Sequence, residues 1–526
     1  MPKYNTKRSR KSTKTVSHEG GVGYTLQPEY ELINILSNGI GKQFYETETD
    51  QTRRLKDAID ATIKSRGVEF VAKALVYARD VIGQRSVTHV GSVFLAPHLS
   101  GEELGKYVFS KRVRHENKGG VVYRMDDMLE IIACYMAKNP GKRLPNSMTK
   151  GFKMALESAD TYELAKYQAS NRGVSLVDVV NLVHPNPSES MEDTFRKLMD
   201  GELKQFNTAE DKNSSAGQEV AEKVRKGEIT EDEAKEELKE KKSENWKDLL
   251  MSKKIGYLSL LRNLRNIIKD TGSDSEEMRM ATELLVNEEF IRKSKVWPHQ
   301  IDLAYEVIKD EFRSSEIRNL SIALSTAYER SVPNLEDEFH GRTAVVIDTS
   351  GSMFSGSWNP LYIGDKRTNR PAIAKGSLIG ATLAKGIGAD LYQFSSSSKE
   401  IKYNPNDPIN TIKNNVLDSQ GEVGHGTRLD TFFKEISDTH YDRIFIISDM
   451  QTMDYARKSV DGYVNKWGQP HIYNIHLCGY KSTIMPHNTP KMYQLFGYGS
   501  DIYELAKKVE VNPKELIDEI ERIQLV

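Results

Sequence analysis

Acidic and hydroxyl side chains occur where apolar runs of this sequence end. The segment AVVIDTSGSM, residues 344–353, places Asp348, Ser350 and Ser352 directly after an apolar run. Thr427 follows the Gly-His-Gly sequence of residues 424–426, and Asp449 ends the segment IFIISD. Neutral hydroxyl oxygens together with carboxylates suit a hard divalent cation. The alternative is that Asp348 and the serines only cap a strand-to-helix turn.

The elements that would position these side chains alternate between strands and helices. Apolar runs rich in β-branched residues occur at 343–347, 390–394, 443–447 and 471–477. A helical stretch at 373–387 carries the small residues Gly376, Gly380, Ala381 and Ala384, which allow close packing. This alternation predicts a parallel, doubly wound α/β domain over residues 341–526, with the polar loops at the carboxyl ends of its strands.

This segment resembles the von Willebrand factor A-type domain. The Asp-x-Ser-x-Ser pattern matches its metal-ion-dependent adhesion site, and the resemblance implies a metal shell of Asp348, Ser350, Ser352, Thr427 and Asp449. We expect a divalent cation here, Mg²⁺ in the first place, with an open position for a partner's carboxylate. His425 lies between glycines and is predicted to be a loop residue, because oxygen ligands already make a hard-cation set.

Catalysis is not expected. The sequence has no GxxxxGK[ST] loop, no HExxH and no zinc-like Cys/His spacing, and we identify no positioned general base. Cys478 ends an apolar run and is predicted to be packed rather than nucleophilic. We therefore do not expect an enzyme.

The preceding part of the chain is predicted to be helical. Apolar residues recur at three- and four-residue steps between 53 and 80 and in several later segments up to about residue 330, which predicts a stacked helical array over 19–335. Two segments depart from this pattern. Residues 1–18 are predicted to be a disordered basic tail, and residues 208–244 a charged surface insertion with a loop and a partly formed helix.

Positive charge gathers locally although the formal net charge is −1. Lys and Arg exceed Asp and Glu by about eight across residues 51–150. Such an excess is expected of a surface that binds a polyanion, but a solvated surface is the alternative. The candidate contacts in this stretch are Arg112, Arg114, Lys142, Arg143 and Lys150.

The bulk composition predicts the cellular compartment of the protein. Only two cysteines, Cys134 and Cys478, occur in 526 residues, which favours a reducing compartment. Neither a membrane-spanning apolar run nor a secretory signal is recognisable. We expect a cytoplasmic location without a membrane partner.

Residues 164–184, LAKYQASNRGVSLVDVVNLVH, resemble the signature of the TROVE domain. The resemblance implies RNA contacts at Lys166, Arg172 and His184. Residues 142–157 and 245–267 are similar to further helical elements of this family. A TROVE domain followed by an A-type domain is the order of the Ro autoantigen family, which the chain resembles.

This resemblance implies a multidomain fold and a function. The first part would be an all-α, HEAT-like helical-repeat ring that is closed by the A-type domain and is monomeric. A small noncoding RNA like Y RNA would bind a basic outer surface, and single-stranded RNA 3′ ends would enter a central hole. RNA quality control or processing, with an exoribonuclease as a further partner, is the expected role of this ribonucleoprotein component.

Two alternatives remain. One is a metal-dependent protein-interaction scaffold built on a helical-repeat platform; the other is a TROVE subunit of a different ribonucleoprotein. An RNA-processing enzyme would need acidic clusters for two metals, which the hydroxyl-rich set does not resemble.

Overall fold

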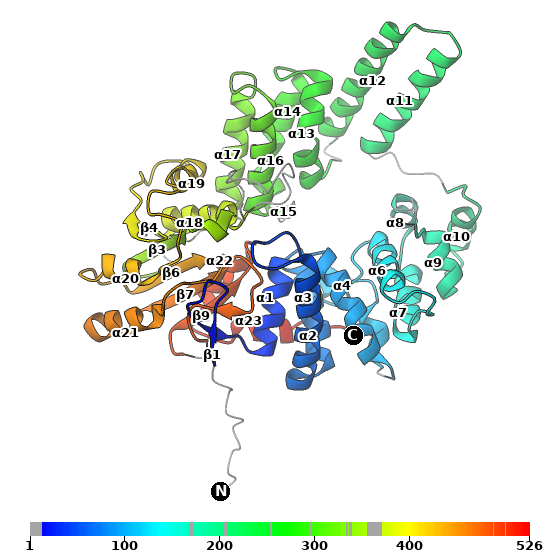
Figure 1. Ribbon diagram of the computed structural model, residues 1–526. Helices are drawn as coiled ribbons and strands as arrows, with labels where there is room; N and C mark the ends of the chain where they lie inside the picture. Colours follow the sequence, from blue (N-terminus) through cyan, green and yellow to red (C-terminus); the bar gives the residue numbers. More distant parts are fainter. Residues whose placement is uncertain are drawn as a thin grey trace. The chain divides into compact units, whose positions relative to one another are not determined.

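The chain divides into two compact units, and each is described by itself. The computed structural model describes residues 13–101, 103–167, 173–203, 209–252, 255–294, 296–332, 335, 339–354, 371–487, 489–499 and 501–526 (Figure 1). Unit 1 contains residues 1–203, 335–407 and 411–526, and unit 2 contains residues 204–334 and 408–410. The units divide the predicted helical domain at Leu203, and its first part belongs with the α/β domain.

A six-stranded sheet forms the core of the C-terminal part of unit 1. Its order is β5-β4-β3-β6-β7-β9, and all neighbours are parallel except β4 and β5. The strands are β3 Thr343–Asp348, β4 Asp390–Phe394, β5 Ser398–Glu400, β6 Arg443–Ser448, β7 His471–His476 and β9 Met492–Phe496. Every residue of β3 and β6 is buried, as expected of central parallel strands covered on both faces.

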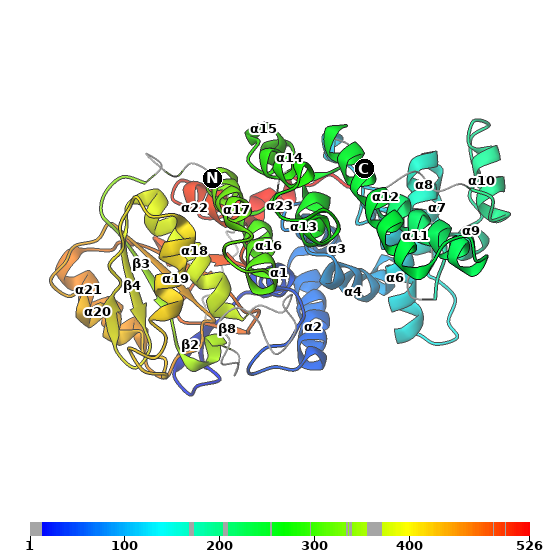
Figure 2. The same cartoon turned by 90° about the horizontal axis from the view of Figure 1, so that it is seen from above.

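Helices cover both faces of this sheet (Figure 2). Helix α18, Ala372–Ile387, packs on the face that carries Ile347; a Cβ atom at Gly380 would lie only 2.3 Å from Ile347 Cδ1, so glycine is needed there. Val346 and Ala344 point to the other face, where they pack with Phe432 and Val460. The helices of that face are α20 Asp430–Glu435 and α21 Ala456–Trp467. The predicted α/β domain with a mostly parallel sheet is confirmed.

The four predicted strands and the predicted helix of this domain occur within a residue or so of their expected bounds. Strand β9 was not predicted, nor were the short edge strand β5 and the remaining helices, α19 Ile409–Asp418, α22 Asp501–Val509 and α23 Glu515–Glu521. The 3-10 turn η3, Gly351–Phe354, follows β3.

The N-terminal segment is part of unit 1. Strands β1 Lys14–Val16 and β2 Val22–Thr25 form an antiparallel hairpin, and β2 pairs with β8 Ser482–Thr483. The prediction of a disordered tail is therefore wrong for residues 14–16, because the backbone of the hairpin finds partners in a strand more than 450 residues away. Residues 1–12 of the predicted tail lie outside the described residues.

Short helices make up the rest of unit 1. They bury apolar faces against one another, and α3 also packs on α23 and α1 on β9. Their bounds are α1 Pro28–Asn38, α2 Glu48–Arg66, α3 Val68–Asp80, α4 Ser86–Leu95, η1 Ala96–Leu99, α5 Gly105–Val108, η2 Arg114–Glu116, α6 Met125–Lys138, α7 Asn146–Glu157, α8 Thr161–Lys166, α9 Leu176–Val183 and α10 Glu192–Met199.

Unit 2 is helical throughout its described part. The helices are α11 Ala209–Arg225, α12 Glu231–Met251, α13 Tyr257–Thr271, α14 Glu276–Leu285, α15 Glu288–Ser294, α16 Pro298–Glu311 and α17 Arg318–Ser331. Helices α11 and α12 pair, and the capping box of Thr230 and Glu233 starts α12. The predicted loop with a partly formed helix at 208–244 is thus wrong for the described residues, which form α11 and α12 with ion pairs such as Lys223–Glu237 between them. No described helix is both long and apolar enough to cross a membrane.

Candidate metal centre and nucleic-acid interface

The five predicted metal-shell residues lie at the carboxyl ends of β3 and β6 and in the loop between α19 and α20. Asp348, Ser350, Thr427 and Asp449 are wholly buried, and Ser352 is nearly so. The peptide N–H of Ser350 donates to Asp348 Oδ1 at 2.9 Å, and the hydroxyl oxygens of Ser350 and Ser352 are 3.3 Å apart. The β3 loop therefore turns both hydroxyls to the side on which Asp348 lies.

Backbone hydrogen bonds hold the three loops together. The N–H of Gly351 donates to the carbonyl of His425 at 3.0 Å, and the N–H of Met453 donates to the carbonyl of Thr427 at 2.8 Å. The Thr427 loop is thus bonded to the β3 loop on one side and to the β6 loop on the other. The predicted shell is brought together, and His425 is an exposed loop residue, as predicted.

Ser448 is a member of this site that the sequence analysis missed. Its hydroxyl donates to Asp348 Oδ2 at 2.7 Å and also accepts from the N–H of Met450 at 2.9 Å. Ser448 therefore fixes the orientation of the Asp348 carboxylate. Its position as the last residue of β6, beside Asp449, was the only signal available.

The electrostatics of the site favour a cation. Burial and the neighbouring charge of Asp449 raise the pKa of Asp348 well above its usual range. Burial also raises the pKa of Asp449 to about 6, opposed by the N–H of Gln451. Among the described residues, neither carboxylate has an ion-pair partner.

Unpartnered oxygen atoms provide a test of whether these residues fit a metal ion. Thr427 Oγ1 and Asp449 Oδ2 are buried and have no hydrogen-bond partner among the residues that the structure describes. A buried polar atom without a partner costs roughly 1–3 kcal/mol, so two at one site call for a ligand. Hydroxyl and carboxylate oxygens fit a hard divalent cation. By contrast, burial raises the pKa of the nearby Cys478 thiol to about 12, which fits a packed rather than a nucleophilic cysteine.

Arg112 is not available to RNA in this structure, which corrects the prediction for that residue. Its side chain is buried, and Nε pairs with Asp80 at 3.1 Å. Its two terminal nitrogens donate to the side chain of Asn117 and to the carbonyls of Gly119 and Gln524. Arg112 thus fastens the C-terminus to the helical part of unit 1.

Arg114 lies two residues away and remains exposed. Its guanidinium pairs with Asp80 at 3.0 Å and stacks over the Tyr123 ring, with 55% of the side chain accessible. Extended backbone would place residues 112 and 114 on the same side, but the 3-10 turn η2 begins at Arg114 and ends this alternation.

Lys166 belongs to a group of cations and aromatic rings that we call the basic aromatic cluster: Arg124, Tyr162, Lys166 and Tyr167. The Arg124 guanidinium and the Lys166 ammonium lie 5.4 and 5.5 Å from the centre of the Tyr167 ring, and Lys166 also donates to Tyr162 Oη at 3.3 Å. Arg124 was not predicted, because it comes 42 positions before Lys166. Arg172 lies outside the described residues.

His184 ends helix α9 in the left-handed conformation, with φ 47° and an exposed side chain. Asn186, two residues on, donates from its N–H to Glu157 at the end of α7. This places His184 near the C-terminal end of α7.

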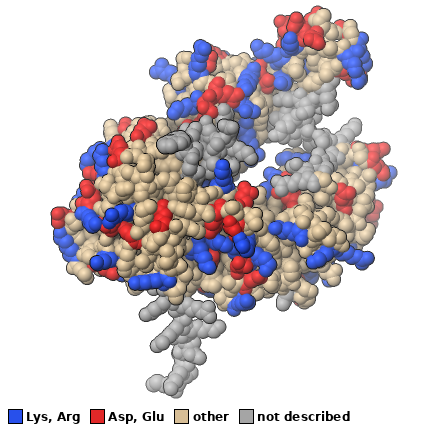
Figure 3. Space-filling view, in the orientation of Figure 1, with Lys and Arg blue, Asp and Glu red and all other residues tan. Residues whose placement is uncertain are grey.

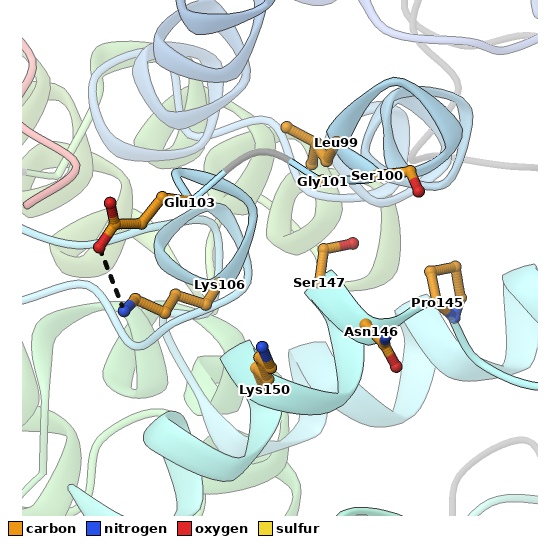
Figure 4. Close-up of a pocket in the computed structure, with 9 residues that line it drawn as sticks. All are labelled: Leu99, Ser100, Gly101, Glu103, Lys106, Pro145, Asn146, Ser147 and Lys150. Carbon is orange, nitrogen blue, oxygen red and sulfur yellow. Dashed lines mark ion pairs between the residues drawn. The ribbon is translucent and has the colours of Figure 1, made fainter.

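Lys142, Arg143 and Lys150 lie at or before the N-terminal end of α7, are exposed and have no ion pair within the described residues. Lys150 and Lys106 line a pocket of about 370 Å³ (Figure 4). Ser147 lines the same pocket from α7, and its buried Oγ has no hydrogen-bond partner in the described part of the chain. Glu103 also lines the pocket and pairs with Lys106 at 3.9 Å (Figure 4). A positive helix end, the Lys150 ammonium and the Ser147 hydroxyl are the groups that remain for an anion.

Ion pairs reduce the basic excess of residues 51–150. Several of its arginines are held by acidic partners: Arg54 by Glu46, Arg66 by Glu29, Arg79 and Arg85 by Asp127, Arg112 by Asp80 and Arg124 by Asp126. On the face drawn in Figure 3, Lys and Arg are interspersed with Asp and Glu. Among the described residues of the helical part of unit 1, the cations left for a polyanion are those around α7, the exposed members of the basic aromatic cluster and Arg114.

Comparisons with known proteins give two findings. Residues 223–349 match the family model of the TROVE domain. This match runs from α11 through unit 2 into β3 and includes residues 245–267, whereas the TROVE-like stretch at 164–184 lies outside it. No curated protein matches the sequence.

The second finding is a shared fold. The crystal structure of the Ro (RSR) protein of Deinococcus radiodurans matches with a TM-score of 0.51 at 14% sequence identity, covering 92% of this chain and 100% of that chain. The likeness therefore extends over both the helical and the α/β parts. The chain thus contains a segment similar to the TROVE domain and shares the fold of a Ro protein.

Proposed function

We propose that this protein is an RNA-binding component of a ribonucleoprotein and that the region around α7 contacts RNA phosphates. The observation that carries the proposal is the group of Lys142, Arg143 and Lys150, which are exposed and free of ion pairs within the described residues. The adjoining pocket adds the hydroxyl of Ser147, which has no hydrogen-bond partner among the described residues. Lysine and arginine contact phosphates without reading bases, so this region would bind RNA through its backbone.

The basic aromatic cluster and His184 would add contacts to unpaired bases. Bases stack on aromatic rings and on guanidinium planes, and Tyr162 and His184 are both exposed. The more specific form of the proposal is a small structured RNA like Y RNA on the basic surface and single-stranded 3′ ends in a central hole. That form, like the exoribonuclease partner and a role in RNA quality control, rests on the family resemblance.

A binding titration tests the proposal. The variant K142E/R143E/K150E should bind a small hairpin RNA with a single-stranded 3′ tail at least tenfold more weakly than wild type in fluorescence anisotropy. Each phosphate contact releases counterions from the RNA. The loss of three contacts should therefore reduce the magnitude of the slope of log affinity against log salt by about 2–3. The control K402E/K458E/K466E reverses three charges on the α/β domain and should leave both quantities unchanged. Equal affinity of the two variants would refute the assignment.

We further propose that the buried oxygen cluster binds a divalent cation, with Mg²⁺ as the physiological ion. Asp348, Ser350, Ser352, Thr427 and Asp449 would hold it, and its charge would offset the two buried carboxylates. The unpartnered Thr427 Oγ1 and Asp449 Oδ2 support this proposal. The set has hydroxyls where a hydrolytic two-metal site would need further carboxylates, so we propose binding and not catalysis.

Removal of the cation by chelation also tests the alternative of a metal-dependent protein-interaction scaffold. If the protein were a metal-dependent interaction scaffold, chelation would release its partner, whereas phosphate contacts around α7 do not involve the cation. RNA affinity that survives EDTA while the melting temperature falls would favour the RNA proposal. RNA affinity that vanishes with the cation would favour a metal-dependent scaffold.

A further inference from the structure

The pocket beside helix α7 has a closed base. Leu99 and Ser147 are its buried lining residues, whereas Ser100 and Lys150 are exposed at its rim. Behind the base, a Cβ atom added at Gly105 would lie only 2.9 Å from Ser147 Cβ, so α5 and α7 are in close contact there. A ligand can therefore enter this pocket only with one of its ends.

The N-terminal end of α7 has no side-chain cap. Pro145 occupies the N-cap position and offers no side-chain acceptor, whereas Asp160 and Ser175 cap α8 and α9 through their side chains. An α-helix leaves its first N–H groups without an intrahelical acceptor, which for α7 are those of Asn146, Ser147 and Met148. Because Pro145 and Asn146 line the pocket, the partial positive charge of this helix end lies beside it.

Ser147 gives an independent indication of a ligand. The residue is 9% exposed, and its Oγ atom is buried without a hydrogen-bond partner among the described residues. Figure 4 shows the Ser147 side chain between α7 and the segment of Leu99 to Gly101. A buried hydroxyl without a partner is unfavourable, so this atom calls for a polar group that enters the pocket.

The charges of the lining favour an anion. Lys150 follows Ser147 by three positions, which places both side chains on one side of α7. The Lys150 ammonium is exposed and has no ion pair within the described residues. Glu103 is the one acidic lining residue that the structure describes, and it pairs with Lys106 at 3.9 Å. An ammonium, a hydroxyl and the N–H groups of a helix end are donors that suit phosphate oxygens.

We propose that this pocket binds the terminal phosphate monoester of an RNA strand. The inference rests on the proposed contact of α7 with RNA and names the part of the RNA that the pocket takes. An internal phosphodiester continues in two directions and does not fit a pocket with a closed base, whereas a terminal phosphate ends the strand. A monoester also carries a charge of roughly −1.5 to −2 and three acceptor oxygens for the donors of the lining.

The segment before α7 is held in place for the rest of the strand. Tyr135 Oη donates to the carbonyl of Arg143 at 3.0 Å, and the N–H of Lys142 donates to the carbonyl of Asn139 at 3.1 Å. The exposed side chains of Lys142 and Arg143 would contact the phosphates that follow the terminal one.

RNA titrations with the full-length protein test this inference. Three hairpin RNAs of one sequence, labelled in the loop, carry a 5′-phosphate, a 3′-phosphate or only hydroxyl ends, and their Kd values are measured by fluorescence anisotropy. In the wild type, one of the phosphorylated RNAs should bind about 10-fold more tightly than the hydroxyl RNA, as expected for a hydrogen bond to a charged group. Which of the two binds more tightly identifies the end that the pocket takes.

Substitutions in the pocket should remove this preference. In Ser147→Ala and in Lys150→Gln, the ratio of the two Kd values should fall to about 2 or less. The matched controls lie at the other end of α7 and should keep the wild-type ratio: Ser158→Ala, whose hydroxyl bonds to the carbonyl of Ala155, and Lys153→Gln, which pairs with Glu157. Ser147→Ala should melt no lower than the wild type, because it removes a buried hydroxyl that has no partner among the described residues.

Inorganic phosphate provides a second readout. At millimolar concentration it should abolish the advantage of the phosphorylated RNA but leave the hydroxyl RNA bound, in comparison with chloride of equal ionic strength.

The outcomes separate the two proposals. If hydroxyl RNA binds and K142E/R143E/K150E weakens it, but a phosphorylated end adds no affinity, the role of the pocket is overturned and the RNA proposal stands. If the preference persists in Ser147→Ala and Lys150→Gln, the terminal phosphate binds elsewhere and the pocket assignment is wrong. If none of the three RNAs binds to the wild type, both proposals are overturned.

Discussion

The hydroxyl of Ser17 bonds to the carbonyl oxygen of Thr452 at 2.5 Å across 435 positions of sequence. The N-terminal segment of unit 1 therefore meets the loop that carries Asp449. Gly21 extends the same contact, since its N–H donates to the carbonyl of Thr452 at 2.9 Å. The N-terminal hairpin is thus part of the wall of the candidate metal centre.

Gly21→Ala should loosen this contact. An added Cβ would lie 2.3 Å from Thr452 O and 2.7 Å from Asp454 N, both of them backbone atoms that cannot move independently. Overpacking of this kind costs about 1–3 kcal/mol, which urea unfolding would measure. Gly462→Ala is the matched control, because a Cβ there meets nothing within 4 Å and the position lies in helix α21. It should be neutral or stabilising by up to about 1 kcal/mol; equal losses in both variants would argue against a close contact at Gly21.

The α/β domain could be predicted because its signals are local. Asp348 and Asp449 each end an apolar run, and parallel strands bring their carboxyl ends to one edge, so adjacency of the loops follows from fold class. Gly376 and Gly380 likewise indicated close packing of α18 on the sheet, and the structure confirms it. The edge strand β5 and the hairpin partner β8 are too short to leave a periodic pattern.

The residues that surround the metal centre from outside the domain were not predictable. Ser17 and Gly21 precede Thr452 by more than 400 positions, and nothing in their local sequence marks them as partners of the loop that follows Asp449. Arg112 and Arg114 show a different limit. Both stand in one basic segment, and only the orientation of the backbone decides that Arg112 is buried on Asp80 while Arg114 is exposed.

Asp127→Asn should destabilise unit 1 strongly. Asp127 is fully buried and accepts ion pairs from Arg79 at 3.1 Å and from Arg85 at 2.8 Å, with His89 at 3.2 Å. Neutralising it leaves the buried Arg79 without an ion-pair partner among the described residues, whereas Arg85 keeps Asp126 and Glu130. The loss of the buried pair should cost about 3–5 kcal/mol in chemical denaturation at pH 7. Asp193→Asn, on exposed helix α10, is the control and should leave the unfolding midpoint unchanged.

The Asp127 carboxylate also predicts how the stability of the protein depends on pH. Although burial raises it, hydrogen bonding to His89 and the charges of Arg79 and Arg85 hold the pKa of Asp127 well below its usual range. A carboxyl whose pKa is depressed by folding stabilises the protein above its unfolded pKa of about 4, and that contribution is lost as the pH falls further. The difference in unfolding free energy between wild type and Asp127→Asn should therefore shrink between pH 5 and pH 3. If the difference in unfolding free energy between the two proteins stays constant over this range, the charge of Asp127 does not contribute to stability.

Arg112 and Arg114 should respond differently to substitution. Arg112→Ala breaks the buried pair with Asp80 and should lower stability by about 3–5 kcal/mol. Arg114→Glu replaces an attractive phosphate contact by a repulsive one and should therefore lower RNA affinity severalfold in anisotropy titrations. Because the side chain is exposed, the melting temperature should change little. Binding to RNA that is insensitive to Arg114→Glu would confine the interface to α7 and the basic aromatic cluster.

His184→Gly separates the stability of helix α9 from the function of its last side chain. The residue has φ 47°, a conformation that costs a non-glycine residue about 1 kcal/mol, so glycine should preserve or raise the melting temperature. If the imidazole stacks on an unpaired base, its loss should weaken binding to a single-stranded RNA about 5-fold or more. Lys491→Gly is the matched control, since Lys491 has φ 58° on the α/β domain and its replacement should relieve a similar conformation without affecting RNA. If glycine is the more stable residue at this position, a contact of the imidazole with RNA best explains the histidine. If His184→Gly binds RNA with unchanged affinity, His184 only ends helix α9.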